Sequence, residues 1–259
     1  MLNEKSPVEM REAIRKGEFS EDTSNLTPGR VQANLVIVKQ EIAFDFLAFC
    51  NANPIPCPVI EVTRPGDPVP KISAPGSDIR TDVGSYRVFK YGKLIDECHD
   101  IKKYWDYTMV AFLIGCSFSF DWILRNEKIP LRHIEENCTV PTYITNIKLN
   151  KVGIFKGTMV TTMRPFNSEN AIKAIKITSR YPKVHGAPIH IGFPEQIGVN
   201  LNKPDFGSKV NIKNGEIPLF WGCGVTPQVV AIQSGVDFMI THSPAHMFLT
   251  DLYINDFIC

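Results

Sequence analysis

The chain has 259 residues, and its 28 lysines and arginines nearly balance its 27 aspartates and glutamates. This length allows one large domain or two smaller ones, and the balanced charge argues against nucleic acid or an anionic membrane as the partner. The amino-terminal segment carries both charges and lacks the apolar core of a secretory signal, and no apolar stretch approaches the ~20 residues that cross a bilayer. We therefore expect a cytoplasmic protein that acts on a small molecule, and the sequence leaves room for a homo-oligomer.

The first half of the chain alternates between helical and strand-like patterns. Apolar residues at helical spacing predict a helix over 7–17, followed by a strand over 33–38, a helix over 42–51 and a buried strand over 57–63. Proline and glycine recur from 64 to 75 and predict a connector without regular structure. Period-two alternation around Tyr91-Gly92 predicts a β-hairpin over 86–97.

The second half continues the alternation. We predict a strand over 109–114, a helix over 119–127, β-segments over 142–149 and 158–163, and a helix over 168–180 that begins with acidic and ends with basic residues. A short helix over 194–197, a hairpin near Asn214-Gly215, a helix over 226–234 and a strand over 238–241 follow.

This order favours an α/β fold with a mixed, mainly parallel central sheet and flanking helices. The β-β-α block predicts a smaller inserted α+β subdomain over 137–182. Residues 1–136 and 183–259 would then form the discontinuous main domain.

An unusual feature occurs twice: an apolar run ends at Gly-Cys and opens into helix-like sequence, in FLIGCS (112–117) and in LFWGCG (219–224). The glycine permits a tight turn, and the free N–H groups at the helix start, with the helix dipole behind them, attract a carboxylate or an oxyanion. We therefore expect each corner to bind an anion. The candidate substrate-binding residues here are Cys116, Ser117, Ser119, Gly224 and Thr226, although each hydroxyl can equally serve as an ordinary N-cap.

Cys116 and Cys223 are also candidate nucleophiles, because a helix N-terminus lowers the pKa of a thiol. The alternative is a small residue that only packs where a strand meets a helix. Glycines on both sides of Cys223 favour its exposure and make it the stronger catalytic candidate. The seven cysteines are odd in number and lack paired C-x-x-C spacing, which indicates reduced thiols and argues against a zinc ribbon.

Two arginines could grip a substrate carboxylate through their bidentate guanidinium. Arg80 lies between Asp78 and Asp82 in a loop, where an internal Arg–Asp tie is the alternative, and Arg164 ends a β-rich run. We take Arg80, Asp82 and Arg164 as candidate substrate-binding residues.

His185, His190 and His242 lie in two late loops and are candidates to move a proton near neutral pH. A purely structural role is the alternative for each. Their spacings match no standard metal-ligand pattern, and we expect neither a metal nor an organic cofactor.

Long strings of the chain resemble the DUF1445 family of hydro-lyases, which is related to the D-glutamate cyclases. The resemblance implies a two-part α/β fold and a lyase that adds or removes water, with cyclisation of D-glutamate to 5-oxo-D-proline as the relative's activity. Ala245 stands where the family pattern leads us to expect glycine. The strings are PGRVQANLVIV (28–38), FDFLAFCNANPIPCPVIEVT (44–63), GSDIRTD (76–82), FLIGCSFSFDWIL (112–124), MRP (163–165), HGAPIHIG (185–192), PDFG (204–207), FWGCGVTPQ (220–228) and THSPAHM (241–247).

The sequence thus predicts a hydro-lyase that acts on a small amino or hydroxy carboxylic acid. One alternative is a cysteine-dependent amidohydrolase or acyl transferase in which Cys223 attacks the substrate. Another is a non-catalytic protein that binds carboxylic acids at the same corners.

Overall fold

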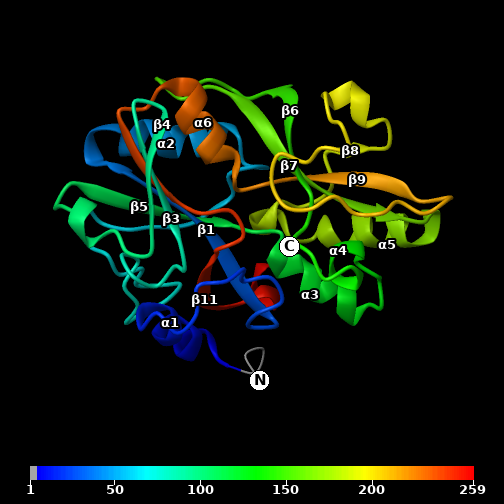
Figure 1. The fold of residues 1–259 in the computed structure, drawn as a ribbon, viewed down its shortest axis with the longest axis horizontal. Helices are drawn as coiled ribbons and strands as arrows, with labels where there is room; N and C mark the ends of the chain where they lie inside the picture. Colours follow the sequence, from blue (N-terminus) through cyan, green and yellow to red (C-terminus); the bar gives the residue numbers. More distant parts are fainter. Residues whose placement is uncertain (1–4) are drawn as a thin grey trace.

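The computed structural model describes residues 5–259 and contains two β-sheets with helices packed on them (Figure 1). The strands are β1 (Arg30–Lys39), β2 (Val59–Val62), β3 (Tyr86–Lys90), β4 (Lys93–Cys98), β5 (Met109–Gly115), β6 (Thr142–Lys148), β7 (Thr158–Phe166), β8 (His190–Ile191), β9 (Ile217–Gly222), β10 (Phe238–His242) and β11 (Phe248–Tyr253). The helices are α1 (Pro7–Arg15), α2 (Gln40–Ala52), α3 (Phe118–Asn126), α4 (Arg132–Glu135), α5 (Ser168–Thr178) and α6 (Thr226–Ser234).

The larger sheet has seven strands, in the order β2-β5-β1-β10-β3-β4, with β11 also paired to β1. The smaller sheet has the order β6-β7-β9-β8. In Figure 1 the larger sheet occupies the left of the molecule and the smaller sheet the right. No helix within residues 5–259 is both long and apolar enough to span a membrane.

The prediction of a mainly parallel central sheet is wrong, because neighbouring strands in both sheets are antiparallel. The predicted alternation of strands and helices is real, but its helices do not join adjacent strands. Strand β2 follows β1 and α2 in the chain and runs parallel to β1. Strand β5 nevertheless lies between β1 and β2 and pairs antiparallel with both. Likewise, α6 connects β9 of the smaller sheet to β10 of the larger one.

Apolar faces explain which helix covers which sheet. On one face of the larger sheet, Phe46 and Phe49 of α2 and Val230 of α6 pack against buried residues of β1, β5 and β10. On the opposite face, Ala74 of the proline-rich connector and Ile79 and Val83 just after it join the core. Helices α3 and α5 pack on the smaller sheet around its Trp221. Each large apolar side chain that is buried in this way contributes about 1.5–3 kcal/mol.

Most predicted elements are present with shifted ends. The hairpin around Tyr91-Gly92 is confirmed as β3 and β4, whereas Asn214-Gly215 forms only a turn before β9. Strand β11 was not predicted. The division at residues 137–182 stays a prediction, and two strands of the smaller sheet, β8 and β9, lie outside that segment.

Candidate active site

The two Gly-Cys corners border one cavity between the sheets. The first corner follows β5 of the larger sheet and leads into α3, and the second follows β9 of the smaller sheet and leads into α6. Segments far apart in sequence therefore contribute to one wall. The lining residues are Asn34, Cys116, Ser117, Phe118, Thr139, Val140, Thr142, Thr162, Phe206, Gly207, Cys223, Val225, Pro244, Ala245 and Met247.

The corner glycines are required because each backbone approaches another segment closely. A Cβ on Gly115 would overlap the carbonyl oxygen of Lys183, and one on Gly222 would lie 2.9 Å from a side-chain carbon of Ile55. A Cβ on Gly224 would overlap the side-chain amide of Asn34. Any larger residue would therefore push a corner away from the cavity.

Asn34 joins the two corners. Its Nδ2 donates to the carbonyl oxygens of Gly115 at 2.7 Å and Ile114 at 3.3 Å, and the same amide abuts Gly224. Asn34 lies where β1 changes partner, from β11 at Ala33 to β10 at Val36. The chain between β10 and β11 leaves the sheet at this gap and supplies Pro244, Ala245 and Met247 to the cavity.

The side chain of His242 contacts Leu35, which lies between the β1 residues that pair with β11 and those that pair with β10. Its Nδ1 lies 3.1 Å from the backbone nitrogen and 3.2 Å from the carbonyl oxygen of Leu35. Burial lowers the pKa of His242 to about 4. The ring therefore stays neutral near pH 7 and completes the sheet, and it is not among the residues that line the cavity.

The other two histidines also lie outside the cavity lining within the described chain. His185 is buried, with Nδ1 2.7 Å from the carbonyl oxygen of Ile55, and burial lowers its pKa to about 4. His190 Nε2 lies 3.1 Å from the carbonyl oxygen of Phe193 at the edge of the smaller sheet. None of the three histidines that we predicted to transfer a proton therefore lines the cavity.

The two cysteine thiols do lie on the wall, 7% and 8% exposed. Burial raises the pKa of Cys116 far above its ordinary value and that of Cys223 to about 11. The backbone N–H groups of Phe118 and Val225 oppose this rise, and so does the charge of Arg164, but burial prevails over the helix starts. Both groups are therefore neutral thiols at pH 7, contrary to the expected lowering of their pKa.

Arg164 lies behind the wall and is fully buried. Its guanidinium forms two 2.8 Å contacts with the carboxylate of Asp121 and donates to Thr162 Oγ1 at 3.0 Å and Ser117 Oγ at 3.2 Å. Burial alone would raise the pKa of Asp121, but Arg164 and His133 together hold it below its ordinary value. The positive charge of Arg164 is thus balanced by Asp121. Arg164 does not line the cavity itself but binds Ser117 and Thr162, whose side chains do.

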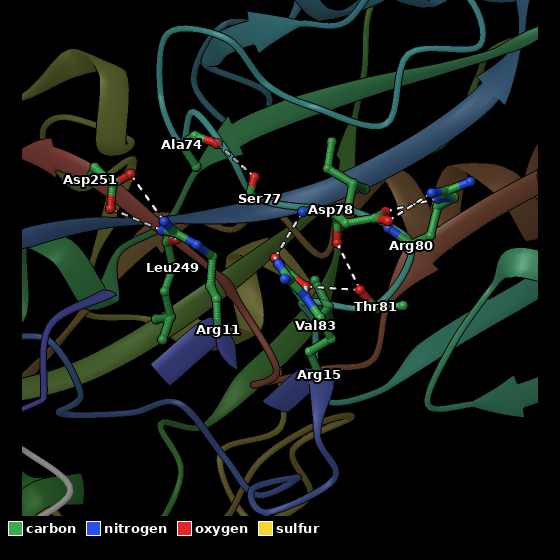
Figure 2. A network of polar contacts seen from close by, with 12 residues as sticks. Arg11, Arg15, Ala74, Ser77, Asp78, Arg80, Thr81, Val83, Leu249 and Asp251 are labelled. Atoms are coloured by element: carbon green, nitrogen blue, oxygen red, sulfur yellow. Dashed lines mark hydrogen bonds and ion pairs between the residues drawn. The ribbon is translucent and has the colours of Figure 1, made fainter. Parts of the chain in front are cut away.

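The predicted pair Arg80 and Asp82 is not part of the cavity lining, and Figure 2 shows Arg80 beside Asp78 in a polar network. Arg80 Nη2 is 2.7 Å from Asp78 Oδ2, and Arg15 of α1 binds the buried Asp82 at 2.6 Å. The loop is therefore held by internal ion pairs, which is the alternative that the sequence left open. A substrate carboxylate would have to displace them.

Two predicted hydroxyls are also engaged in holding the fold. Ser119 Oγ accepts a hydrogen bond from the Gln32 backbone at 3.0 Å, and Thr226 Oγ1 donates to the Cys223 carbonyl at 2.6 Å. Ala245 adopts φ 68°, so the turn that favours glycine is kept, with some strain, by a residue with a side chain. Within residues 5–259, no group of three or more histidine, cysteine, aspartate or glutamate side chains is arranged to hold a metal ion.

Sequence reasoning missed Asn34, Thr142, Thr162 and Asp121. Asn34 had a visible signal, since it is a polar side chain inside the apolar strand QANLVIV (32–38). The two threonines and Asp121 gave none, because strands and helix starts commonly contain such residues.

Comparison with known proteins places the chain among related sequences. The sequence model of the family described as D-glutamate cyclase matches residues 110–251, which include both corners. The chain belongs to the D-glutamate cyclase family. Three bacterial relatives carry the name "Putative hydro-lyase", and each aligns over nearly its full length. They come from Bacillus licheniformis (55% identical, 97% of this chain and 96% of the relative), Geobacillus kaustophilus (52%, 95% and 94%) and Stutzerimonas stutzeri (51%, 95% and 94%).

These findings confirm the family that the sequence resembles and agree with the predicted lyase class. Among solved structures, a nitrogen repressor-like protein from Methanococcus jannaschii aligns with 95% of this chain and 97% of its own at a TM-score of 0.38 and 10% identity. A likeness at that level carries no argument about this fold or its activity.

Proposed function

We propose that the cavity between the two corners is the active site of a lyase that removes water from a small carboxylic acid, with D-glutamate and 5-oxo-D-proline as substrate and product. The observation that carries the proposal is the convergence of both Gly-Cys corners on one cavity. The D-glutamate cyclase family supports the choice of substrate.

Cyclisation proceeds by attack of the substrate amine on the carbon of its side-chain carboxyl group. An oxyanion forms at that carbon, and one oxygen then leaves as water, whose two protons balance the two that the ammonium nitrogen gives up. The starts of α3 and α6 lie on the cavity wall at Ser117, Phe118 and Val225, and a helix N-terminus favours both a bound carboxylate and a developing oxyanion. The hydroxyls of Ser117 and Thr162, held by Arg164, add donors in fixed positions.

The departing oxygen needs a proton donor, and the cavity offers the thiols of Cys116 and Cys223. Because burial keeps both protonated at neutral pH, they are suited to donate a proton. No histidine of the described chain borders the cavity, so we assign the proton transfer to the thiols in place of His185, His190 and His242.

The same observations weaken the alternative of a cysteine nucleophile. That chemistry requires a thiolate or an adjacent base, whereas both thiols have a raised pKa, and the cavity wall formed by residues 5–259 contains no histidine, aspartate or glutamate.

The test follows purified protein by NMR with D-glutamate, 5-oxo-D-proline and a panel of hydroxy acids. We expect interconversion of D-glutamate and 5-oxo-D-proline, reduced about 100-fold or more in Cys223→Ser, since general acid catalysis contributes about 10²–10⁴-fold. Cys259→Ser, at the exposed end of the chain, is the matched control and should retain activity. Binding of these acids without conversion of any would contradict the proposal and favour a non-catalytic binding protein.

A further inference from the structure

We infer that Asn34 and Thr139, with Asp22 behind Thr139, bind the amino group of the substrate and so select an amino acid over an acid that lacks the amine. The inference rests on the proposed function for the location of the site. It deepens that function by naming residues that determine specificity.

Two hydroxyl groups of the cavity wall are left to act as donors. Arg164 donates to the oxygen of Ser117 at 3.2 Å and to that of Thr162 at 3.0 Å. A guanidinium group has no acceptor, so each hydroxyl oxygen must accept, and its hydrogen stays available. Neither hydroxyl donates to another protein group within residues 5–259. Ser117 and Thr162 therefore suit a carboxylate of the bound acid.

Thr139 has the opposite polarity. Its hydroxyl donates to the carboxylate of Asp22, which can only accept. Because the hydroxyl hydrogen is used in this way, the Thr139 oxygen can only accept from a bound molecule. Thr139 lines both the cavity and a neighbouring pocket that Asp22 borders, so it separates Asp22 from the cavity.

Asn34 also offers an acceptor. Its Nδ2 donates to the carbonyl oxygens of Gly115 and Ile114, which fixes the orientation of the amide. Its Oδ1 accepts no hydrogen bond from the described part of the chain. A primary ammonium group carries three donors and no acceptor, so it matches Asn34 and Thr139.

Charges one hydrogen bond behind the wall follow the same division. Arg164 lies behind the two donor hydroxyls, and its charge is balanced by Asp121. Asp22 contacts the Thr139 hydroxyl and the Ser24 backbone N–H, and within residues 5–259 it forms no ion pair. Its negative charge therefore favours a cationic group at Thr139.

The experiment compares D-glutamate with glutarate, which is the same dicarboxylate without the amino group. Calorimetry measures both affinities in the Cys223→Ser background, for which the proposed function predicts slow conversion. We expect D-glutamate to bind about tenfold or more tightly than glutarate, because a hydrogen bond to a charged group is among the stronger ones. This preference should fall about tenfold in Asp22→Asn and in Thr139→Val, with the affinity for glutarate changed less than about twofold. Thr139→Ser keeps the hydroxyl and should keep the preference.

Asp106→Asn is the matched control. Asp106 likewise accepts from a threonine hydroxyl and from a backbone N–H two residues ahead, but it lies outside the cavity lining. This variant should retain both affinities, and circular dichroism checks the fold of every variant.

The outcomes separate this inference from the proposed function. Equal affinity for the two acids, an equal loss for both in Asp22→Asn, or failure of both to bind would overturn the inference. Water loss without a preference for D-glutamate over glutarate would leave the lyase intact and overturn the role of Asp22 and Thr139. Preferential binding of D-glutamate without its conversion by the unmodified protein would support the inference and contradict the lyase.

Discussion

The side-chain amide of Asn34 donates a 2.7 Å hydrogen bond to the carbonyl oxygen of Gly115. The same amide leaves no space for a Cβ on Gly224, so one side chain of β1 sets the position of both corners. The two halves of the proposed active site are therefore connected through a residue that can be changed without altering either cysteine.

Replacement of Asn34 by alanine should lower turnover about tenfold or more while the protein still folds. The change leaves the Gly115 and Ile114 carbonyls without this donor, and loss of a partner for buried polar groups costs about 1–3 kcal/mol. Steady-state kinetics with D-glutamate measure the effect. Asn53→Ala is the matched control, because Asn53 is also buried and bonds two backbone carbonyls but lies outside the cavity lining. Equal activity loss in both variants would contradict the role of Asn34.

Gly224→Ala should reduce both stability and turnover, since the new methyl group overlaps the amide of Asn34. Overpacking of this kind costs about 1–3 kcal/mol. The double variant Asn34→Ala with Gly224→Ala removes the overlap and should recover part of the stability that Gly224→Ala loses. Urea unfolding of the two single variants and the double variant measures the coupling. If the double variant lost as much stability as the two single variants together, Asn34 and a residue at position 224 would not be in steric conflict, which would contradict the prediction.

Asp121→Asn should lower the free energy of unfolding by about 3–5 kcal/mol, because it leaves the buried charge of Arg164 without compensation. The control is Glu169→Gln, which breaks an exposed ion pair with Lys173 and should cost less than about 1 kcal/mol. Chemical denaturation measures both variants. Similar small losses would mean that Arg164 does not depend on Asp121.

Acidification should destabilise the protein through His185 and His242. Each has a folded pKa of about 4 against an ordinary value of 6.5, so between these values the unfolded chain binds protons that the folded chain does not. Stability is lost as the pH falls below 6.5, by about 1.4 kcal/mol per pH unit for each histidine. Urea unfolding between pH 7 and 4.5 measures the slope of the unfolding free energy against pH. In His185→Gln this slope should be smaller by the contribution of one histidine, about 1.4 kcal/mol per pH unit. An unchanged slope in that variant would contradict the buried neutral state of His185.

Local patterns in the sequence predicted the elements better than their arrangement. Helix α5 and the hairpin of β3 and β4 follow from capping, periodicity and a turn at Tyr91-Gly92, which are local properties. The antiparallel sheets were missed because β5 enters between β1 and β2, a pairing between segments far apart in sequence. Strand β11 pairs with the distant start of β1 and was missed for the same reason.

In the candidate site, too, local features were predicted and long-range contacts were not. The doubled Gly-Cys pattern identified both corners, because the glycines reflect local backbone geometry. The sequence could not show that His242 completes a sheet, that Arg80 pairs with Asp78, or that burial outweighs the helix dipole at the thiols. Each of these depends on contacts that form only when the chain is folded.

The measurement that tests the shared cavity most directly is protection of individual cysteines from alkylation, mapped by mass spectrometry with and without 5-oxo-D-proline. Cys116 and Cys223 should react slowly with iodoacetamide, and bound 5-oxo-D-proline should slow both further to a similar extent. The exposed Cys259 is the internal control and should react at the same rate in both samples. Protection of only one corner cysteine, or of neither under conditions where the acid binds, would contradict a single active site formed by both corners.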